Sequence, residues 1–157
     1  MKAASLSEIK KELSVISTAQ LMEITLRLAK HKVENKELLT YLLFDAADEK
    51  GYIIEVKNEM ENQFQTINTT NLYFAKKSIR KILRFTNKHC RYVSNKEAQI
   101  ELLFHFCSLF KDSSIAKEKS VALMNLYHGQ IKKLETQLSI LHEDVQYDYK
   151  KMMERLT

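Results

Sequence analysis

The chain of 157 residues contains no proline and only two glycines, Gly51 and Gly129. β-Rich folds need turn residues with positive φ at many corners, and glycine is the usual residue there. Doubly wound α/β folds need Val- and Ile-rich buried strands, and no segment of the sequence has that pattern. The sequence therefore excludes an all-β fold and predicts an all-α protein.

The positions of the two glycines also restrict the chemistry. Neither a P-loop nor the G-x-G-x-x-G fingerprint can be written with glycines at 51 and 129, and no G-x-S-x-G nucleophile elbow is present. These absences exclude the common backbone cradles for nucleotides. No nucleophile–base pair can be argued from the remaining residues, so we expect no enzyme activity, no small-molecule substrate and no cofactor.

The cysteines and the N-terminal residues indicate the cellular compartment of the protein. Cys90 and Cys107 lie 17 positions apart, which does not make a disulfide framework. The N-terminal residues carry charges and lack the apolar segment of a secretory signal. The longest strongly apolar run, residues 102–110, is too short to span a bilayer. We therefore expect a cytoplasmic protein with no membrane partner.

Apolar residues recur three and four positions apart along the whole chain, and capping residues separate the runs. This pattern predicts seven or eight antiparallel helices in one domain, residues 1–157, arranged as a bundle or as a short stack of α-α hairpins. The expected helices cover about 6–16, 18–31, 35–48, 52–67, 71–92, 94–111 and 115–141, followed by a break near 142–144 and a terminal helix.

Three of these helices carry specific packing predictions. The helix at 18–31 should bury Leu21, Ile24 and Leu28, and the helix at 35–48 should bury Leu42 and Leu43. The helix at 94–111 is apolar nearly all round, which is typical of a central helix. We expect it to be the most buried element.

The net charge of +5 is unevenly distributed. Residues 62–96 contain eight Lys and Arg residues and no acidic residue, whereas residues 45–61 are acidic. Helical geometry at 71–92 places Ile79 and Ile82 on one face and a stripe of cations on the other. We call this stripe the basic face; its residues are Lys77, Arg80, Lys81, Arg84, Lys88 and Arg91.

Two interpretations of the basic face remain open. It could bind several phosphates of a nucleic acid without reading sequence, with Tyr73 and Tyr92 stacking on unpaired bases. It could instead be solvated or contact an acidic protein surface, such as Glu55 and Glu59 of another copy. An anionic membrane is disfavoured because the stripe has no large apolar face beside it.

A metal site can be considered for His89, Cys90, His105 and Cys107. Neither His–Cys pair has the spacing of a zinc finger, and Cys107 lies in the middle of an apolar helix. A buried structural cysteine explains that position better, so we predict no metal.

The first third of the chain resembles an uncharacterised group of small bacterial proteins. The residues that carry the resemblance are Ser5-Leu6-Ser7-Glu8-Ile9-Lys10-Lys11-Glu12-Leu13, Leu26-Arg27-Leu28-Ala29-Lys30 and Glu34-Asn35-Lys36-Glu37-Leu38-Leu39. The resemblance covers roughly the first 45 positions. It implies an all-helical cytoplasmic protein and carries no activity, cofactor or catalytic residue.

Together these observations predict a non-enzymatic cytoplasmic interaction or scaffold module that binds protein, a second copy of itself included. The alternative is sequence-independent nucleic-acid binding through the basic face of the helix at about 71–92. A scaffold requires an exposed apolar surface larger than monomers normally show. Nucleic-acid binding requires an exposed basic face without acidic cover.

Overall fold

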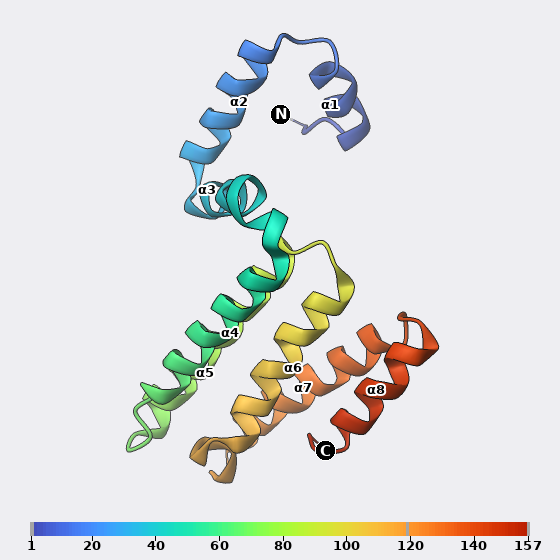
Figure 1. Cartoon of the computed structure of the whole chain (residues 1–157). Helices are drawn as coiled ribbons and strands as arrows, with labels where there is room; N and C mark the ends of the chain where they lie inside the picture. The colour runs from blue at the N-terminus through green and yellow to red at the C-terminus, as the bar shows by residue number, and fades with distance from the viewer. Residues whose placement is uncertain (1, 119, 157) are drawn as a thin grey trace. The chain divides into compact units, whose positions relative to one another are not determined.

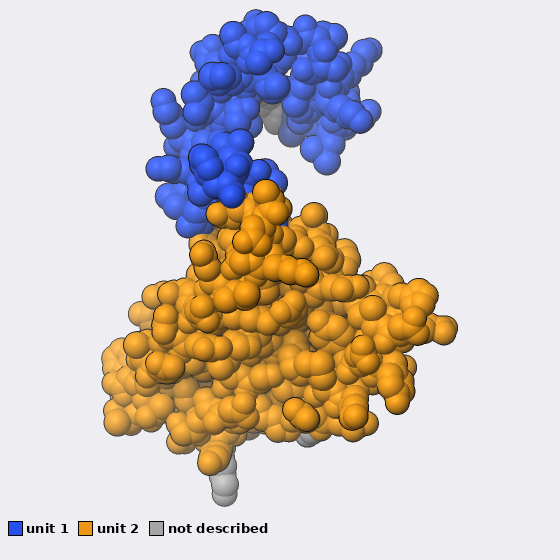
Figure 2. Space-filling view, viewed as in Figure 1, with its two compact units in different colours: residues 1–44 blue, residues 45–157 orange. Residues whose placement is uncertain are grey.

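A computed structural model of the chain describes residues 2–118 and 120–156. Throughout these residues the secondary structure is helical and contains no strand, which confirms the all-α prediction (Figure 1). The chain divides into two compact units, Met1–Phe44 (unit 1) and Asp45–Thr157 (unit 2), which Figure 2 colours separately. The single domain expected from the sequence stays a prediction.

Unit 1 consists of α1 (Leu6–Leu13), α2 (Thr18–His31), α3 (Val33–Thr40) and most of a π-helical turn. The predicted capping boxes at the starts of α1 and α2 are both present, formed by Ser5 with Glu8 and by Ser17 with Gln20. Helices α2 and α3 are packed neighbours. The side chain of Asn35 ties them together, because its Nδ2 donates to the carbonyl of Leu28 at 2.9 Å.

The single helix expected at 35–48 is not formed. Instead α3 is followed by the π-helical turn Tyr41–Asp45 and the short 3-10 helix Ala46–Asp48. A π turn holds more residues than an α turn and so rotates the side chains that follow. Leu42 and Leu43 lie within this turn and are 57% and 65% exposed, so the prediction that they pack into a core is wrong.

Unit 2 contains α4 (Glu49–Gln65), α5 (Leu72–Tyr92), α6 (Lys96–Asp112), the 3-10 helix η3 (Ser114–Lys117), α7 (Val121–Leu138) and α8 (Glu143–Met153). Helices α4 to α7 run alternately up and down, as an antiparallel bundle does (Figure 1). Helix α6 packs against α4, α5 and α7. The seventh helix begins at 121 rather than 115 because η3 takes the first residues, and the expected break before the terminal helix is present.

The core of unit 2 is built around α6, as predicted. Leu102, Phe106 and Cys107 of this helix have no exposed surface. Met60 of α4 and Ile79 of α5, two helices that pack against α6, are also fully buried. The C-terminal end is held by the hydroxyl of Tyr127, which donates to the carbonyl of Leu156 at 2.7 Å. Across the described part of the chain, no helix combines the length and the apolar character needed to cross a membrane.

Candidate interaction surfaces

The basic face lies on the outer side of α5. Five of its six predicted residues are exposed, namely Lys77, Arg80, Lys81, Arg84 and Arg91, and Lys88 is half-buried. The opposite side of the helix is buried, with Ile79 and Ile82 in the core of unit 2. The 3.6-residue period of the sequence therefore placed these cations correctly.

Local hydrogen bonds fix this orientation of α5. Asn71 caps the helix, since its side chain accepts from the backbone amide of Tyr73 at 2.9 Å. Thr86 is fully buried on the inner side, and its hydroxyl is satisfied by the carbonyl of Ile82 at 3.0 Å. Near the other end, Lys88 Nζ lies 6.0 Å from the centroid of the Phe85 ring, at cation–π range.

A hollow of about 540 Å³ lies along one edge of the basic face, and we call it the basic groove. Its lining residues are Tyr73, Lys76, Lys77, Arg80, Leu83, Arg84 and Asn87. Three of the predicted cations therefore line the groove, while Lys81, Lys88 and Arg91 lie outside it. Tyr73 is 69% exposed, whereas Tyr92 is buried and cannot stack on a base.

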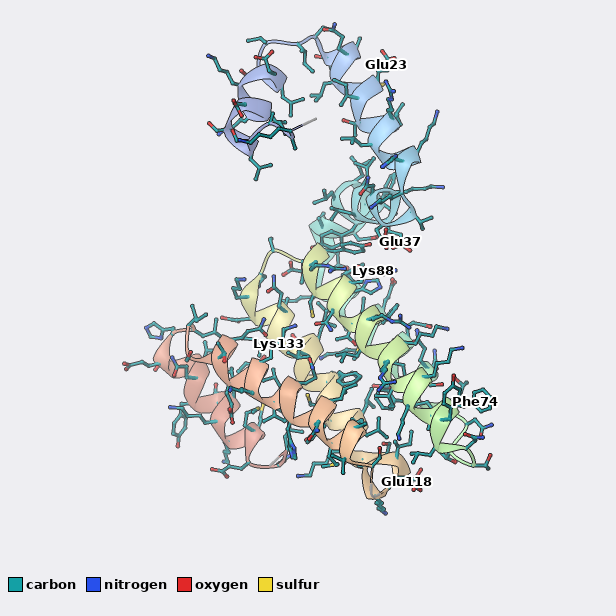
Figure 3. The ribbon with its side chains drawn as sticks, turned by 180° about the vertical axis from the view of Figure 1, so that it is seen from behind. Glu23, Glu37, Phe74, Lys88, Glu118 and Lys133 are labelled. Atoms are coloured by element: carbon teal, nitrogen blue, oxygen red, sulfur yellow. The ribbon has the colours of Figure 1, made fainter. Side chains whose placement is uncertain are left out.

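A further cation beside the basic groove comes from α7. Lys133 Nζ donates to Asn87 Oδ1 at 2.6 Å, so α7 contributes a positive charge at the rim (Figure 3). The sequence offers the pair Lys132-Lys133, but its periodicity does not reveal which helix α7 faces. The sequence therefore does not identify Lys133 as part of this surface.

Five residues of the basic face, Lys77, Arg80, Lys81, Arg84 and Arg91, are exposed. None of the five makes an ion pair within residues 2–118 and 120–156. Glu55 and Glu59 of α4 are exposed, and Glu59 accepts a hydrogen bond from Gln63 of its own helix. Among the described residues, ion pairs therefore leave these five charges unneutralised, and Glu55 and Glu59 do not pair with them.

A second charged cluster joins α4 to α6, and we call it the clamp: Lys57, Glu61, Glu101 and His105. Lys57 pairs with Glu101, and His105 Nε2 lies 3.1 Å from Glu61 Oε1. Burial lowers the pKa of His105, the charge of Lys57 adds to this, and Glu61 opposes it. The clamp joins two helices that pack against each other, α4 and α6.

The four residues considered for a metal are engaged elsewhere. Tyr52 shares a 2.6 Å hydrogen bond with Nδ1 of His89, and His105 belongs to the clamp. Burial raises the pKa of Cys90 to about 11 and that of Cys107 to about 12, so both thiols stay protonated at neutral pH. Among the residues that the structure describes, no group of three or more His, Cys, Asp or Glu side chains is placed to hold a metal ion.

Unit 1 carries the second candidate surface, which is apolar. None of the described side chains in α1, α2 and α3 is buried. The predicted core line of α2 is wrong, because Leu21, Ile24 and Leu28 are 41–57% exposed. Sequence periodicity identified the apolar side of α2 but could not tell whether another element covers it.

A hollow of about 320 Å³ between α2 and α3 lies on this surface, and we call it the apolar groove. Its lining residues are Thr25, Leu28, Ala29, Asn35, Leu38, Leu39 and Leu42. A neighbouring hollow on α2 is lined by Ile24, Leu28, His31 and the cations Arg27 and Lys30. The apolar groove therefore has a basic edge on the α2 side.

These two surfaces differ in what they can bind. The basic groove offers several cations and one exposed aromatic ring, which suits a chain of phosphates. The apolar groove offers leucines and a basic edge, which suits the apolar side of a helix. Comparison of the chain with family models, with curated proteins and with solved structures finds no match.

Proposed function

We propose that this chain is a non-enzymatic interaction module that binds protein through unit 1. The observation that carries the proposal is the exposure of the N-terminal helices. Thirteen large apolar side chains between Leu6 and Phe44 are 38–85% exposed. Large exposed apolar surfaces mark interaction sites on soluble proteins.

The energetics support the same conclusion. Helices of 8 to 14 residues, the lengths of α1 to α3, are marginal in water unless an apolar side is packed. With on the order of 80 Å² on each side chain, the exposed set offers about 1,000 Å², against about 800 Å² per partner in a standard interface. Covering this surface with protein would supply the packing that unit 1 lacks.

A photo-crosslinking amino acid at Leu42 tests the proposal in the native cells of the protein. Leu42 lines the apolar groove, so we expect a covalent adduct with a second polypeptide, and mass spectrometry identifies it. The matched control places the same crosslinker at Glu23, which is exposed on α2 and takes no part in lining either hollow (Figure 3).

Introducing Leu28→Glu beside the crosslinker should abolish the Leu42 adduct, because a carboxylate then enters the apolar groove. Equal adducts from Leu42 and Glu23, or an adduct that survives Leu28→Glu, would show that the groove is not a docking site.

A second function is favoured by the five exposed cations of the basic face, namely sequence-independent binding of nucleic acid. Five exposed cations span four turns of α5 without an ion pair among the described residues. Lys133 adds a charge at the edge, and Tyr73 offers a ring for stacking on an unpaired base. Phosphate contacts of this kind release counterions, so affinity should fall steeply with salt.

The test measures binding of a labelled single strand and a labelled duplex over a salt series. The slope of log affinity against log salt should correspond to about 0.9 per phosphate contacted in the duplex. Arg80→Glu/Arg84→Glu should weaken binding strongly and flatten the slope. The matched control, Lys10→Glu/Lys11→Glu in α1, changes the net charge equally, so an equal loss from both variants would contradict a site on α5.

A further inference from the structure

Helix α1 carries an apolar ridge that is exposed in the part of the chain that the structure describes. Leu6, Ile9 and Leu13 repeat at spacings of three and four, and they are 85%, 43% and 38% exposed. Ser5 and Glu8 form a capping box at its start, in which the Ser5 amide donates to Glu8 at 2.7 Å. The capping box fixes where the helix begins, and packing of the ridge would stabilise this short helix.

The same chain carries an uncovered site for such a ridge. The apolar groove lies between α2 and α3, and four of its seven lining residues are leucines. An amphipathic helix commonly docks by laying its i, i+3 and i+7 side chains into a groove of this kind. Leu6, Ile9 and Leu13 have that spacing.

Charges beside the ridge and beside the groove are complementary. Glu12 lies one residue from the end of the ridge, while Arg27 and Lys30 line the hollow next to the groove. All three are exposed, and the part of the chain that the structure describes contains no ion-pair partner for them. A ridge seated in the groove would bring Glu12 toward these cations.

Chain length argues against the ridge filling the groove of its own molecule. Residues 14–17 connect α1 to α2, so a folded-back α1 would run beside the first half of α2. Eight helical residues span about 12 Å, at about 1.5 Å per residue. The groove residues of α2, Thr25 to Ala29, begin seven residues after the start of that helix, which is about 10 Å along its axis. The α1 helix of the same molecule would therefore reach only the near end of the groove.

We propose that two copies of this chain pair through unit 1, with the α1 ridge of each copy lying in the apolar groove of the other. The proposal rests on the proposed function, since it names the protein that the apolar surface binds. A ridge and a groove on one chain generate two equal contacts about a two-fold axis, which is the usual symmetry of homodimers.

The experiment measures the molar mass of the purified full chain by light scattering over a concentration series. We expect dimers. Ile9→Glu in the ridge and Leu28→Glu in the groove should each raise the dissociation constant about 30-fold or more, as loss of an apolar anchor does. Leu26→Glu is the matched control, because Leu26 is as exposed on α2 as Leu28 but lines neither hollow.

Mixing the two variants gives the sharper result. Each variant alone loses both contacts, but the Ile9→Glu copy keeps an intact groove and the Leu28→Glu copy keeps an intact ridge. Differently labelled copies should therefore form heterodimers when mixed, with one of the two contacts restored. Circular dichroism shows whether each variant keeps its helices.

A wild-type chain that stays monomeric, a dimer that tolerates both variants, or a mixture without heterodimers would overturn the pairing. Failure of the pairing is separable from failure of the proposed function. A monomer whose Leu42 crosslinks to a different protein retains the docking function, whereas a monomer without that adduct loses both.

Discussion

His105 is a half-buried imidazole between α4 and α6, and the groups packed around it shift its protonation. Burial lowers its pKa and the charge of Lys57 acts in the same direction, so the folded chain keeps the ring neutral at pH 7. An exposed histidine in the unfolded chain has a pKa of about 6.5. The unfolded chain therefore takes up this proton at a higher pH than the folded chain does.

Acidification should consequently destabilise the protein through this residue. The contribution of neutral His105 to the free energy of unfolding is complete above the pKa that its imidazole has in the unfolded chain. It is lost as the pH falls through the lower pKa that the imidazole has in the folded chain. We predict that the free energy of unfolding, measured by urea denaturation, falls between pH 7 and pH 5. His105→Gln should reduce this dependence, and His128→Gln, at an exposed histidine, serves as the control. Equal slopes for His105→Gln and the wild type would contradict the assignment.

The sequence predicts which residues of α5 are exposed, because a helix that buries its apolar side turns the residues of the opposite side toward solvent. That reasoning placed Lys77, Arg80 and Arg84 at the surface. The same reasoning could not place Lys133 beside Asn87, nor show that Tyr92 is buried, because both facts depend on how neighbouring elements pack. The sequence thus predicts which side of α5 is charged but not the shape of the groove beside it.

Among the elements, α6 has the most predictable position. A helix that is apolar on every side can only lie at the centre of a bundle, and seven of its residues are buried. Phe106 has no exposed surface and meets the ring of Phe64 edge-on, at 5.7 Å between centroids. Removing this side chain should leave a cavity at the centre of unit 2.

Phe106→Ala should therefore lower the free energy of unfolding by about 3–5 kcal/mol. Phe74→Ala is the control, because Phe74 is half exposed on α5, and it should cost less than about 1 kcal/mol. Denaturant titration of both variants measures the difference. Similar losses from the two substitutions would mean that α6 is not the centre of the cooperative unit.

The segment at 35–48 contains an irregular element that the sequence pattern does not predict. Its apolar residues fit one broad helical face, and the sequence contains no proline or glycine there to interrupt a helix. The π turn at Tyr41–Asp45 changes the register without any such marker. Leu42, Leu43 and Phe44 of this turn are exposed, so the most apolar run of unit 1 lies at its surface.

At the scale of the whole molecule, composition predicts a packed core but not its location. The chain is 45% apolar, which is ordinary for a folded domain. The structure places the fully buried side chains in unit 2, although apolar residues are also frequent in unit 1. No shift of composition marks the boundary between Phe44 and Asp45, so the sequence offers no signal for the division.

The absence of buried side chains in α1 to α3 has a consequence for the exchange of backbone amide hydrogens with solvent. In an isolated chain these helices can unfold locally without disrupting a core, so their backbone amides should exchange rapidly through local fraying. Amides of α6 exchange only when the bundle opens. If unit 1 pairs, protection of the first 40 residues should rise with protein concentration, whereas protection of α6 should be the same at every dilution.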